Sequence, residues 1–129
     1  IAGKRTVDFN ISHSGEFILA VFAVGMDIGV DVQEMAECPD YREIAENFYT
    51  AEEAEDVKNE GPDLFFQYWA AKEAYVKALG IGLGRGMDFF SVRNGKIAEK
   101  DKKDQDWFLY PVRIKGYAAY VAAHKKGDR

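Results

Sequence analysis

Apolar side chains recur at helical spacing between about residues 63 and 79, where they give a wide buried face. The apolar positions of this face are Phe65, Tyr68, Trp69, Tyr75, Val76 and Leu79. Gly80 follows directly, and glycine often ends a helix because it adopts left-handed backbone dihedrals without strain. The pattern therefore predicts a long core helix. It carries two charged residues one turn apart, Glu73 and Lys77.

Two shorter helices are predicted ahead of the long one. Asp40 can cap a helix that ends near residue 48, because its carboxylate can accept hydrogen bonds from free amides of the first turn. Thr50 and Glu53 have the spacing of a capping box, which predicts a short acidic helix to about residue 58.

Strands are predicted on both sides of this helical block, from short runs rich in β-branched and aromatic residues. The predicted strands are residues 7–11, 17–24, 28–33, 88–92, 107–114 and 117–124. Turns are expected at Ser14-Gly15, Asn94-Gly95 and Lys115-Gly116. Together the elements predict an α+β fold in which an antiparallel sheet packs on the long central helix, with residues 1–129 forming one domain.

Composition limits the kind of protein this is. With 129 residues, 47% hydrophobic and 14% aromatic, the chain can bury a real core. No apolar run approaches the roughly 20 residues that span a bilayer, so no membrane contact is expected and the cytoplasm is the expected compartment. The formal charge of −5 argues against general nucleic-acid binding. The one cysteine, Cys38, cannot form an internal disulfide.

Several polar features have ordinary explanations. Taken alone, Glu73 and Lys77 are typical of a solvated ion pair between successive helical turns. The acidic stretch at residues 52–56 fits a solvated helix face better than a docking surface. The glycine-rich segment 80–86 follows a helix and lacks the known nucleotide-binding patterns, so a connector fits it better than a phosphate cradle.

Three segments change this interpretation because they occur together. They are Phe9-Asn10-Ile11-Ser12-His13-Ser14, Gly29-Val30-Asp31-Val32-Gln33 and Trp69-Ala70-Ala71-Lys72-Glu73-Ala74-Tyr75-Val76-Lys77. In this order they resemble the motifs F-N-x-S-H-S, G-[IV]-D-[IV]-E and W-x-x-K-E-A-x-x-K of the 4′-phosphopantetheinyl transferase superfamily, Sfp-type branch. The third segment is the most specific, and the resemblance covers essentially the whole chain.

The resemblance implies transfer of 4′-phosphopantetheine from coenzyme A to a serine of an acyl or peptidyl carrier protein, with release of 3′,5′-ADP. It implies that Mg²⁺ bridges Asp31, Glu73 and the pyrophosphate, and that Glu73 takes the proton of the carrier serine. It further implies that Ser12 and His13 contact coenzyme A phosphates and that Lys77 reaches the pyrophosphate. The pathway, whether of fatty acids, polyketides or nonribosomal peptides, is left open.

The metal prediction agrees with elementary coordination chemistry. In a strand, Asp31 points opposite to Val30 and Val32, towards the face that Gln33 shares, although an exposed aspartate would fit the same pattern. Mg²⁺ usually takes one or two carboxylates, so Asp31 and Glu73 would suffice, and Mn²⁺ accepts the same oxygens. Gln33 stands where the family often has a third carboxylate. Its neutral amide is a weaker ligand, and holding a metal-bound water is the alternative role.

Two further assignments stay open at this stage. Lys72 points either to solvent or to the nucleotide. Ser12-His13-Ser14 follows a predicted strand, so its polar groups either face a phosphate or only stabilise the turn.

The resemblance also predicts that the chain is incomplete. Sfp-type enzymes have two similar halves with the site between them, and this chain corresponds to the last strands of the first half and the complete second half. A G-K-P motif that contacts coenzyme A is expected before Ile1, so Gly3-Lys4-Arg5 should not be mistaken for it. Carrier docking is expected in residues 35–62.

Two other functions compete with the transferase. One is a non-catalytic half-domain that docks a carrier or binds a nucleotide, and that needs the missing half or a partner chain. The other is an unrelated α+β interaction domain in which Glu73 and Lys77 only pair with each other. The two upstream motifs argue against this last alternative, because an ion pair that arose by chance would not be accompanied by two further motifs of the same family.

Overall fold

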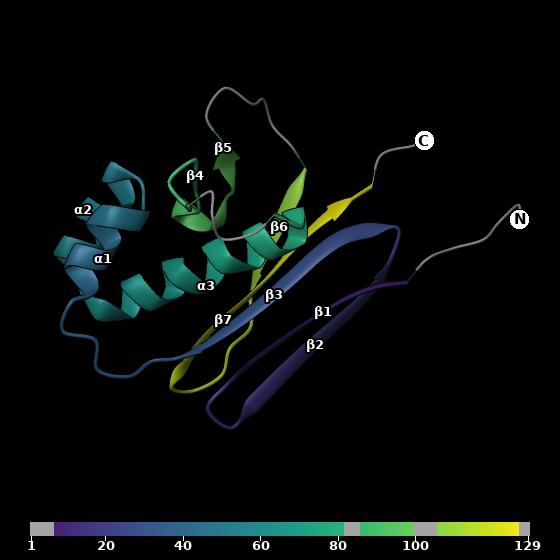
Figure 1. The fold of residues 1–129 in the computed structure, drawn as a ribbon, viewed down its shortest axis with the longest axis horizontal. Coiled ribbons are helices and arrows are strands. Elements are labelled where there is room, and N and C mark those ends of the chain that lie inside the picture. The colour runs from purple at the N-terminus through teal and green to yellow at the C-terminus, as the bar shows by residue number, and fades with distance from the viewer. Residues whose placement is uncertain (1–6, 82–85, 100–105, 127–129) are drawn as a thin grey trace, which may run out of the picture.

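The long helix lies against one face of a three-stranded antiparallel sheet. The structure, a computed structural model, describes residues 7–81, 86–99 and 106–126. The helix is α3 (Pro62–Leu79), and the sheet has the strand order β3 (Met26–Glu34), β7 (Tyr117–Lys125) and β6 (Trp107–Pro111). Figure 1 shows α3 running alongside β3 and β7.

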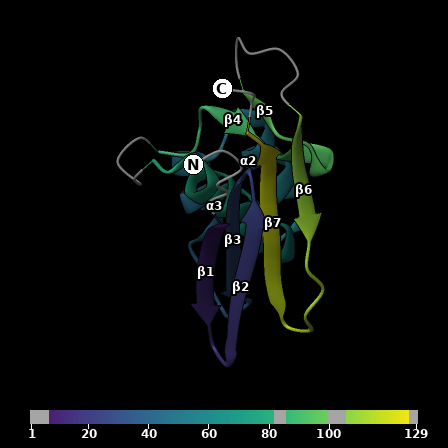
Figure 2. The same cartoon turned by 90° about the vertical axis from the view of Figure 1, so that its right-hand side faces the viewer.

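The remaining elements flank this pair of layers. β1 (Val7–Ser14) and β2 (Phe17–Val24) form a hairpin beside β3, as Figure 2 shows. The helices α1 (Tyr41–Phe48) and α2 (Ala51–Glu60) pack against α3. A second, small hairpin consists of β4 (Phe90–Ser91) and β5 (Ala98–Glu99), joined through the 3₁₀ turn η2 (Arg93–Gly95).

β3 crosses α3 so closely that one position admits only glycine. A Cβ atom on Gly29 would lie 2.1 Å from the carbonyl oxygen of Ala74 and 2.6 Å from the amide nitrogen of Ala78. Real side chains do not show such contacts, so the backbones of strand and helix touch because Gly29 has no side chain. This contact places Asp31, two residues further along β3, beside the helix.

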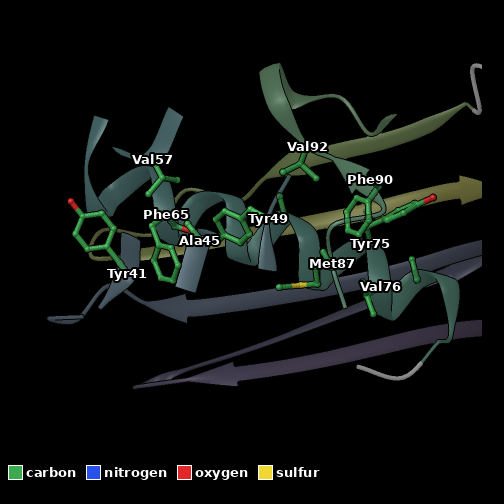
Figure 3. Close-up of a cluster of buried hydrophobic side chains, with 14 residues drawn as sticks. Tyr41, Ala45, Tyr49, Val57, Phe65, Tyr75, Val76, Met87, Phe90 and Val92 are labelled. Atoms are coloured by element: carbon green, nitrogen blue, oxygen red, sulfur yellow. Dashed lines mark hydrogen bonds between the residues drawn. The ribbon is translucent and has the colours of Figure 1, made fainter. Parts of the chain in front are cut away.

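The core lies between α3, the short helices and the segment around β4. Its buried members, most of them labelled in Figure 3, include five aromatic residues. These are Tyr41, Tyr49, Phe65, Tyr75 and Phe90. The rings of Tyr49 and Phe65 stack at 5.7 Å, and the Tyr49 hydroxyl donates a 2.7 Å hydrogen bond to the Phe65 carbonyl oxygen. The buried hydroxyl is therefore satisfied, and α3 is tied to the residue that follows α1.

The predicted helices are largely confirmed. The long helix differs from its predicted start by one residue and ends at Gly80, whose φ is 73°. The capping box is present, since Thr50 Oγ1 accepts from the Glu53 amide at 3.1 Å and Glu53 Oε1 accepts from the Thr50 amide at 3.0 Å. Asp40 precedes α1 as expected but makes no capping hydrogen bond, so that part of the prediction is wrong.

The strand predictions are confirmed only in part. β1 continues to Ser14, so Ser12-His13-Ser14 lies within a strand and the turn falls one residue later, at Gly15-Glu16. Of the predicted strand 88–92 only Phe90–Ser91 is extended, and it pairs with β5 rather than with the main sheet. The turns at Asn94-Gly95 and Lys115-Gly116 are confirmed. Residues 82–85 of the predicted connector lie outside the described residues.

No helix among the described residues is long and apolar enough to cross a membrane.

Candidate functional site

Strand β1 is attached to the free edge of β3 by its side chains. Alternate side chains of β1 accept hydrogen bonds from alternate backbone amides of β3. The pairs are Asn10 Oδ1 with the Val30 amide at 2.9 Å, Ser12 Oγ with the Val32 amide at 3.1 Å, and Ser14 Oγ with the Glu34 amide at 2.8 Å. The Val32 bond is buried, where an amide needs such a partner, and much of the first motif therefore serves to cover the edge of β3.

The carboxylate of Asp31 lies within this junction and is only 6% exposed. Ser12 Oγ donates to Asp31 Oδ1 at 3.3 Å, and Gln33 Nε2 donates to Asp31 Oδ2 at 2.8 Å. Two donors from neighbouring strands therefore orient the carboxylate group.

Helix α3 brings Glu73 and Lys77 to the same junction. Both side chains are half-buried. The Lys77 ammonium donates to the carbonyl oxygens of Val30 at 2.7 Å and Ile11 at 2.8 Å, so it joins α3 to both β3 and β1. An ammonium has three donors, and one remains beyond these two bonds. Residues 31, 73 and 77 thus meet although more than 40 positions separate the aspartate from the helical pair.

Burial has the largest effect on the pKa of each of the three charged groups, Asp31, Glu73 and Lys77. It raises the pKa of Asp31 to about 6, with a further increase from the negative charge of Glu73 and opposing effects from Gln33, Lys77 and Ser12. Burial also raises the pKa of Glu73, against the favourable charge of Lys77. The pKa of Lys77 is lowered by burial, which its two acidic neighbours oppose. The folded protein therefore holds two acids whose ionised forms are costly.

The donor set fits a hard divalent cation. Asp31 and Glu73 supply two carboxylates, which is the usual protein contribution to an Mg²⁺ site that water and substrate phosphates complete. A cation would also relieve the repulsion between the two charges. Within residues 7–81, 86–99 and 106–126, no group of three or more His, Cys, Asp and Glu side chains is gathered for a metal.

Gln33 is held beside Asp31 by a hydrogen bond. The amide nitrogen donates this bond, so the amide oxygen is the atom left for a cation or for a metal-bound water. Direct ligation of the metal by Gln33 and a role in holding a metal-bound water therefore both stay predictions.

Ser12 and His13 are adjacent in a strand, so their side chains point to opposite faces of the hairpin. Ser12 is buried with its hydroxyl bonded to Asp31 and Val32, whereas His13 is exposed. The predicted contacts of both residues with coenzyme A phosphates stay predictions, and the structure gives Ser12 a second role in orienting Asp31.

Lys72 does not point to solvent or into the site, and that prediction is wrong. Its side chain is 0% exposed, and its ammonium donates at 2.6 Å both to Glu53 Oε1 and to the Phe90 carbonyl oxygen. The sequence contained a signal for this burial, because Lys72 lies three residues from Trp69 and three from Tyr75, within the apolar face of the helix.

The acidic stretch of α2 is likewise not uniformly solvated. Glu53 is 0% exposed and accepts from Lys72, while Asp56 accepts from Arg93 Nε at 2.7 Å and holds a 2.7 Å hydrogen bond from the Tyr68 hydroxyl. The bond to Arg93 lowers the pKa of Asp56. The interpretation as a solvated face therefore holds for Glu52 and Glu55 and is wrong for Glu53.

Comparison with known proteins agrees with the motif pattern. Residues 27–123 match the 4′-phosphopantetheinyl transferase superfamily, and the chain therefore belongs to that superfamily. The matched segment contains Asp31 with all but the first residue of its strand, and the whole helix that carries Glu73 and Lys77.

Curated relatives carry the same description. The 4′-phosphopantetheinyl transferase Sfp of Bacillus subtilis is 38% identical over 66% of this chain and 38% of its own length. A putative 4′-phosphopantetheinyl transferase of Synechocystis is 37% identical over 66% of this chain and 36% of its own length. The rat L-aminoadipate-semialdehyde dehydrogenase-phosphopantetheinyl transferase is 29% identical over 94% of this chain and 47% of its own length. The chain thus spans less than half the length of these relatives.

Proposed function

We propose that this chain carries the catalytic acids of a transferase that moves 4′-phosphopantetheine from coenzyme A to a serine of an apo acyl or peptidyl carrier protein and releases 3′,5′-ADP. The observation that supports this most is the junction of Asp31, Glu73 and Lys77 in a chain of this superfamily. The proposed compartment is the cytoplasm, in keeping with a single cysteine.

Each of the three side chains has a chemical task in this proposal. Asp31 and Glu73 would hold Mg²⁺, or Mn²⁺, which supplies positive charge against the pyrophosphate of coenzyme A. Lys77 has one donor left for a pyrophosphate oxygen, where charge accumulates as the leaving group departs.

Glu73 is the proposed base. The carrier serine oxygen attacks the pantetheine-side phosphorus, the bond from that phosphorus to the 3′,5′-ADP oxygen breaks, and the serine proton passes to the Glu73 carboxylate directly or through a water. Burial raises the pKa of Glu73, which brings the carboxylate closer to the basicity that proton transfer at neutral pH requires.

The carrier is proposed to dock on residues 35–62 and the adjoining flank of α3. A cavity of about 320 Å³ opens there between the segment after β3 and the start of α3, lined in part by Cys38, Tyr41 and Phe66. Residues 35–62 contain nine acidic and two basic residues, so an acidic carrier would be held there by apolar contacts rather than by charge.

The test is the mass of a carrier protein after incubation with this chain, coenzyme A and Mg²⁺. Intact-mass spectrometry should show the gain of one phosphopantetheine, and a chelator or the Asp31→Ala substitution should abolish it. Failure with several carriers, by this chain and by a longer polypeptide that contains it, would overturn the proposal.

A second candidate function is a half-domain that works only with further polypeptide, and the hairpin surface favours it. One face of the hairpin carries six large apolar side chains that are 48–74% exposed. They are Val7, Phe9, Ile11, Ile18, Phe22 and Val24. Cross-strand pairing joins Val7 with Val24 and Phe9 with Phe22, so the surface is continuous. Contiguous apolar surfaces of this kind usually contact another chain or domain.

The same mass measurement separates the two candidates when it is run on this chain by itself and on a longer polypeptide that contains it. Transfer by this chain alone supports a self-sufficient site. Transfer only by the longer protein supports the half-domain, in which residues outside this chain complete the site.

A further inference from the structure

A fully buried ion pair lies on the side of α3 away from β3. Glu53 and Lys72 are each 0% exposed, and their oxygen and nitrogen atoms are 2.6 Å apart. In Figure 1, α2 and β4 lie on one side of α3 and β3 runs along the other. Lys72 directly precedes Glu73 in α3, so one residue points to the buried pair and the next to the proposed site.

The pair connects α3 to two other elements through further hydrogen bonds of both charged groups. Glu53 Oε1 also accepts from the Thr50 amide at 3.0 Å, and Oε2 accepts from the Val92 amide at 2.7 Å. Lys72 Nζ also donates to the Phe90 carbonyl oxygen at 2.6 Å and lies 4.2 Å from the centre of the Phe90 ring. The start of α2, the middle of α3 and the β4 segment are therefore held by one cluster.

Helix α3 is thus held at two sides. Gly29 of β3 touches its backbone at Ala74 and Ala78, and the Glu53–Lys72 pair holds the opposite side. On the strand side, contact with Gly29 limits the distance between helix and strand, and the Lys77 hydrogen bonds to the Val30 and Ile11 carbonyl oxygens are made through a long flexible side chain that tolerates some rotation of the helix about its own axis. The ion pair can set that rotation, because charge-assisted hydrogen bonds are directional.

A small rotation of α3 about its axis would displace the side chains of Glu73 and Lys77 enough to affect catalysis. Side-chain tips lie roughly 5–6 Å from the axis of an α-helix, so a rotation of about 10° moves them by about 1 Å. A misplacement of about 1 Å in a catalytic group can reduce the rate by about 100-fold.

We propose that the Glu53–Lys72 pair is a positioning device that fixes the rotation of α3, so that Glu73 and Lys77 face Asp31. Lys72 and Glu53 are positioning residues, which act through Glu73 and Lys77 without touching substrate. The expected effect on turnover rests on the proposed transferase function, whereas the expected effect on cation binding does not.

The competing explanation is that the pair only contributes to folding stability. Buried ion pairs can often be replaced by uncharged residues with little loss of stability, so the two explanations can be separated experimentally. The key variants are Lys72→Met, which keeps a long unbranched chain, and the double variant Glu53→Gln with Lys72→Met, which leaves no unpaired buried charge. Val57→Ala is the matched control, because Val57 is also 0% exposed on α2 and its side chain belongs to the apolar core cluster rather than to the charged one.

Mn²⁺ binding, measured by electron paramagnetic resonance in the absence of carrier and coenzyme A, is the primary readout. All variants are measured at a temperature at which circular dichroism shows them to be folded. The double variant is expected to bind Mn²⁺ at least about tenfold more weakly than the wild type, and Val57→Ala within about twofold of it. In transferase assays the double variant should lose about 10- to 100-fold in kcat with a smaller change in KM for coenzyme A.

The possible results distinguish the positioning role of the ion pair from the proposed transferase function. Wild-type Mn²⁺ affinity in the folded double variant, or an equal loss in Val57→Ala, overturns the positioning role. If Lys72→Met does not fold, the double variant decides the question by itself. If the wild-type chain binds Mn²⁺ but neither it nor a longer polypeptide that contains it modifies any carrier, the proposed function fails, and the Mn²⁺ affinities alone still test the positioning role.

Discussion

Replacing Asp31 with asparagine should stabilise the folded protein at neutral pH in the absence of metal. The carboxylate is almost completely buried, and its pKa in the folded state is about 6, against an ordinary value of 3.8. Folding therefore disfavours the ionised form, mainly through burial. Asparagine has nearly the same shape and carries no charge, so it removes this cost and the metal ligand together.

The magnitude follows from the two pKa values. At 1.36 kcal/mol per pKa unit, the difference between about 6 and 3.8 corresponds to about 3 kcal/mol. Below about pH 4 the carboxyl group is protonated in both the folded and the unfolded state, so no cost exists. As pH rises from about 4 to 6 the unfolded state ionises first and stability is lost, and above pH 6 the loss is complete. The pKa of about 6 already includes the hydrogen bond from Gln33 to the ionised carboxylate, so the expected gain in stability at pH 8 is the full amount of about 3 kcal/mol.

Urea unfolding, followed by tryptophan fluorescence with a chelator present, measures the prediction. The free energy of unfolding of Asp31→Asn minus that of the wild type should be below about 1 kcal/mol at pH 4 and about 3 kcal/mol at pH 8. Adding Mg²⁺ should stabilise the wild type and leave Asp31→Asn unchanged. An equal difference at both pH values, or a loss of stability at pH 8, would refute the assignment of the cost to a buried ionised Asp31.

Three further substitutions test the junction. Gly29→Ala places a Cβ atom 2.1 Å from the Ala74 carbonyl oxygen. We therefore expect the free energy of unfolding in urea to fall by about 3 kcal/mol and Mn²⁺ binding to be lost. Wild-type stability would show that helix and strand do not touch there. Ser12→Ala leaves the buried Val32 amide without its acceptor and should cost about 1–3 kcal/mol, and a change within experimental error would contradict the edge contact. Glu73→Gln should abolish Mg²⁺-dependent binding of coenzyme A in calorimetry, whereas unchanged binding would exclude Glu73 as a ligand.

Local signals predicted the elements whose causes are local. The apolar periodicity before Gly80 indicated α3, because amphipathic spacing and a left-handed terminating glycine both act within a few residues. The capping box of Thr50 and Glu53 was predictable for the same reason. The three motifs also indicated Asp31, Glu73 and Lys77 as a group, and the structure brings these residues to one junction.

Other predictions failed where long-range contacts decide the outcome. The polar residues Ser12 to Ser14 suggested a turn, yet they lie in β1 because the unpaired edge of β3 offers amides for Ser12 and Ser14 to bind. The predicted strand 88–92 is shortened because Phe90–Ser91 pairs with β5 alone.

The charged residues show most clearly which features depend on local sequence and which depend on tertiary contacts. The sequence by itself determined the long helix, the capping box, the family and the identity of the candidate acids, since each depends on residue type at short spacing. Only the tertiary structure decided which charges are buried and with what partner. Lys72 and Glu73 are neighbours in one helix, but Lys72 meets Glu53 in the core and Glu73 faces the strand of Asp31. The reason is physical: whether a charge can leave water depends on the partners that distant segments bring to it, and those partners exist only in the folded chain.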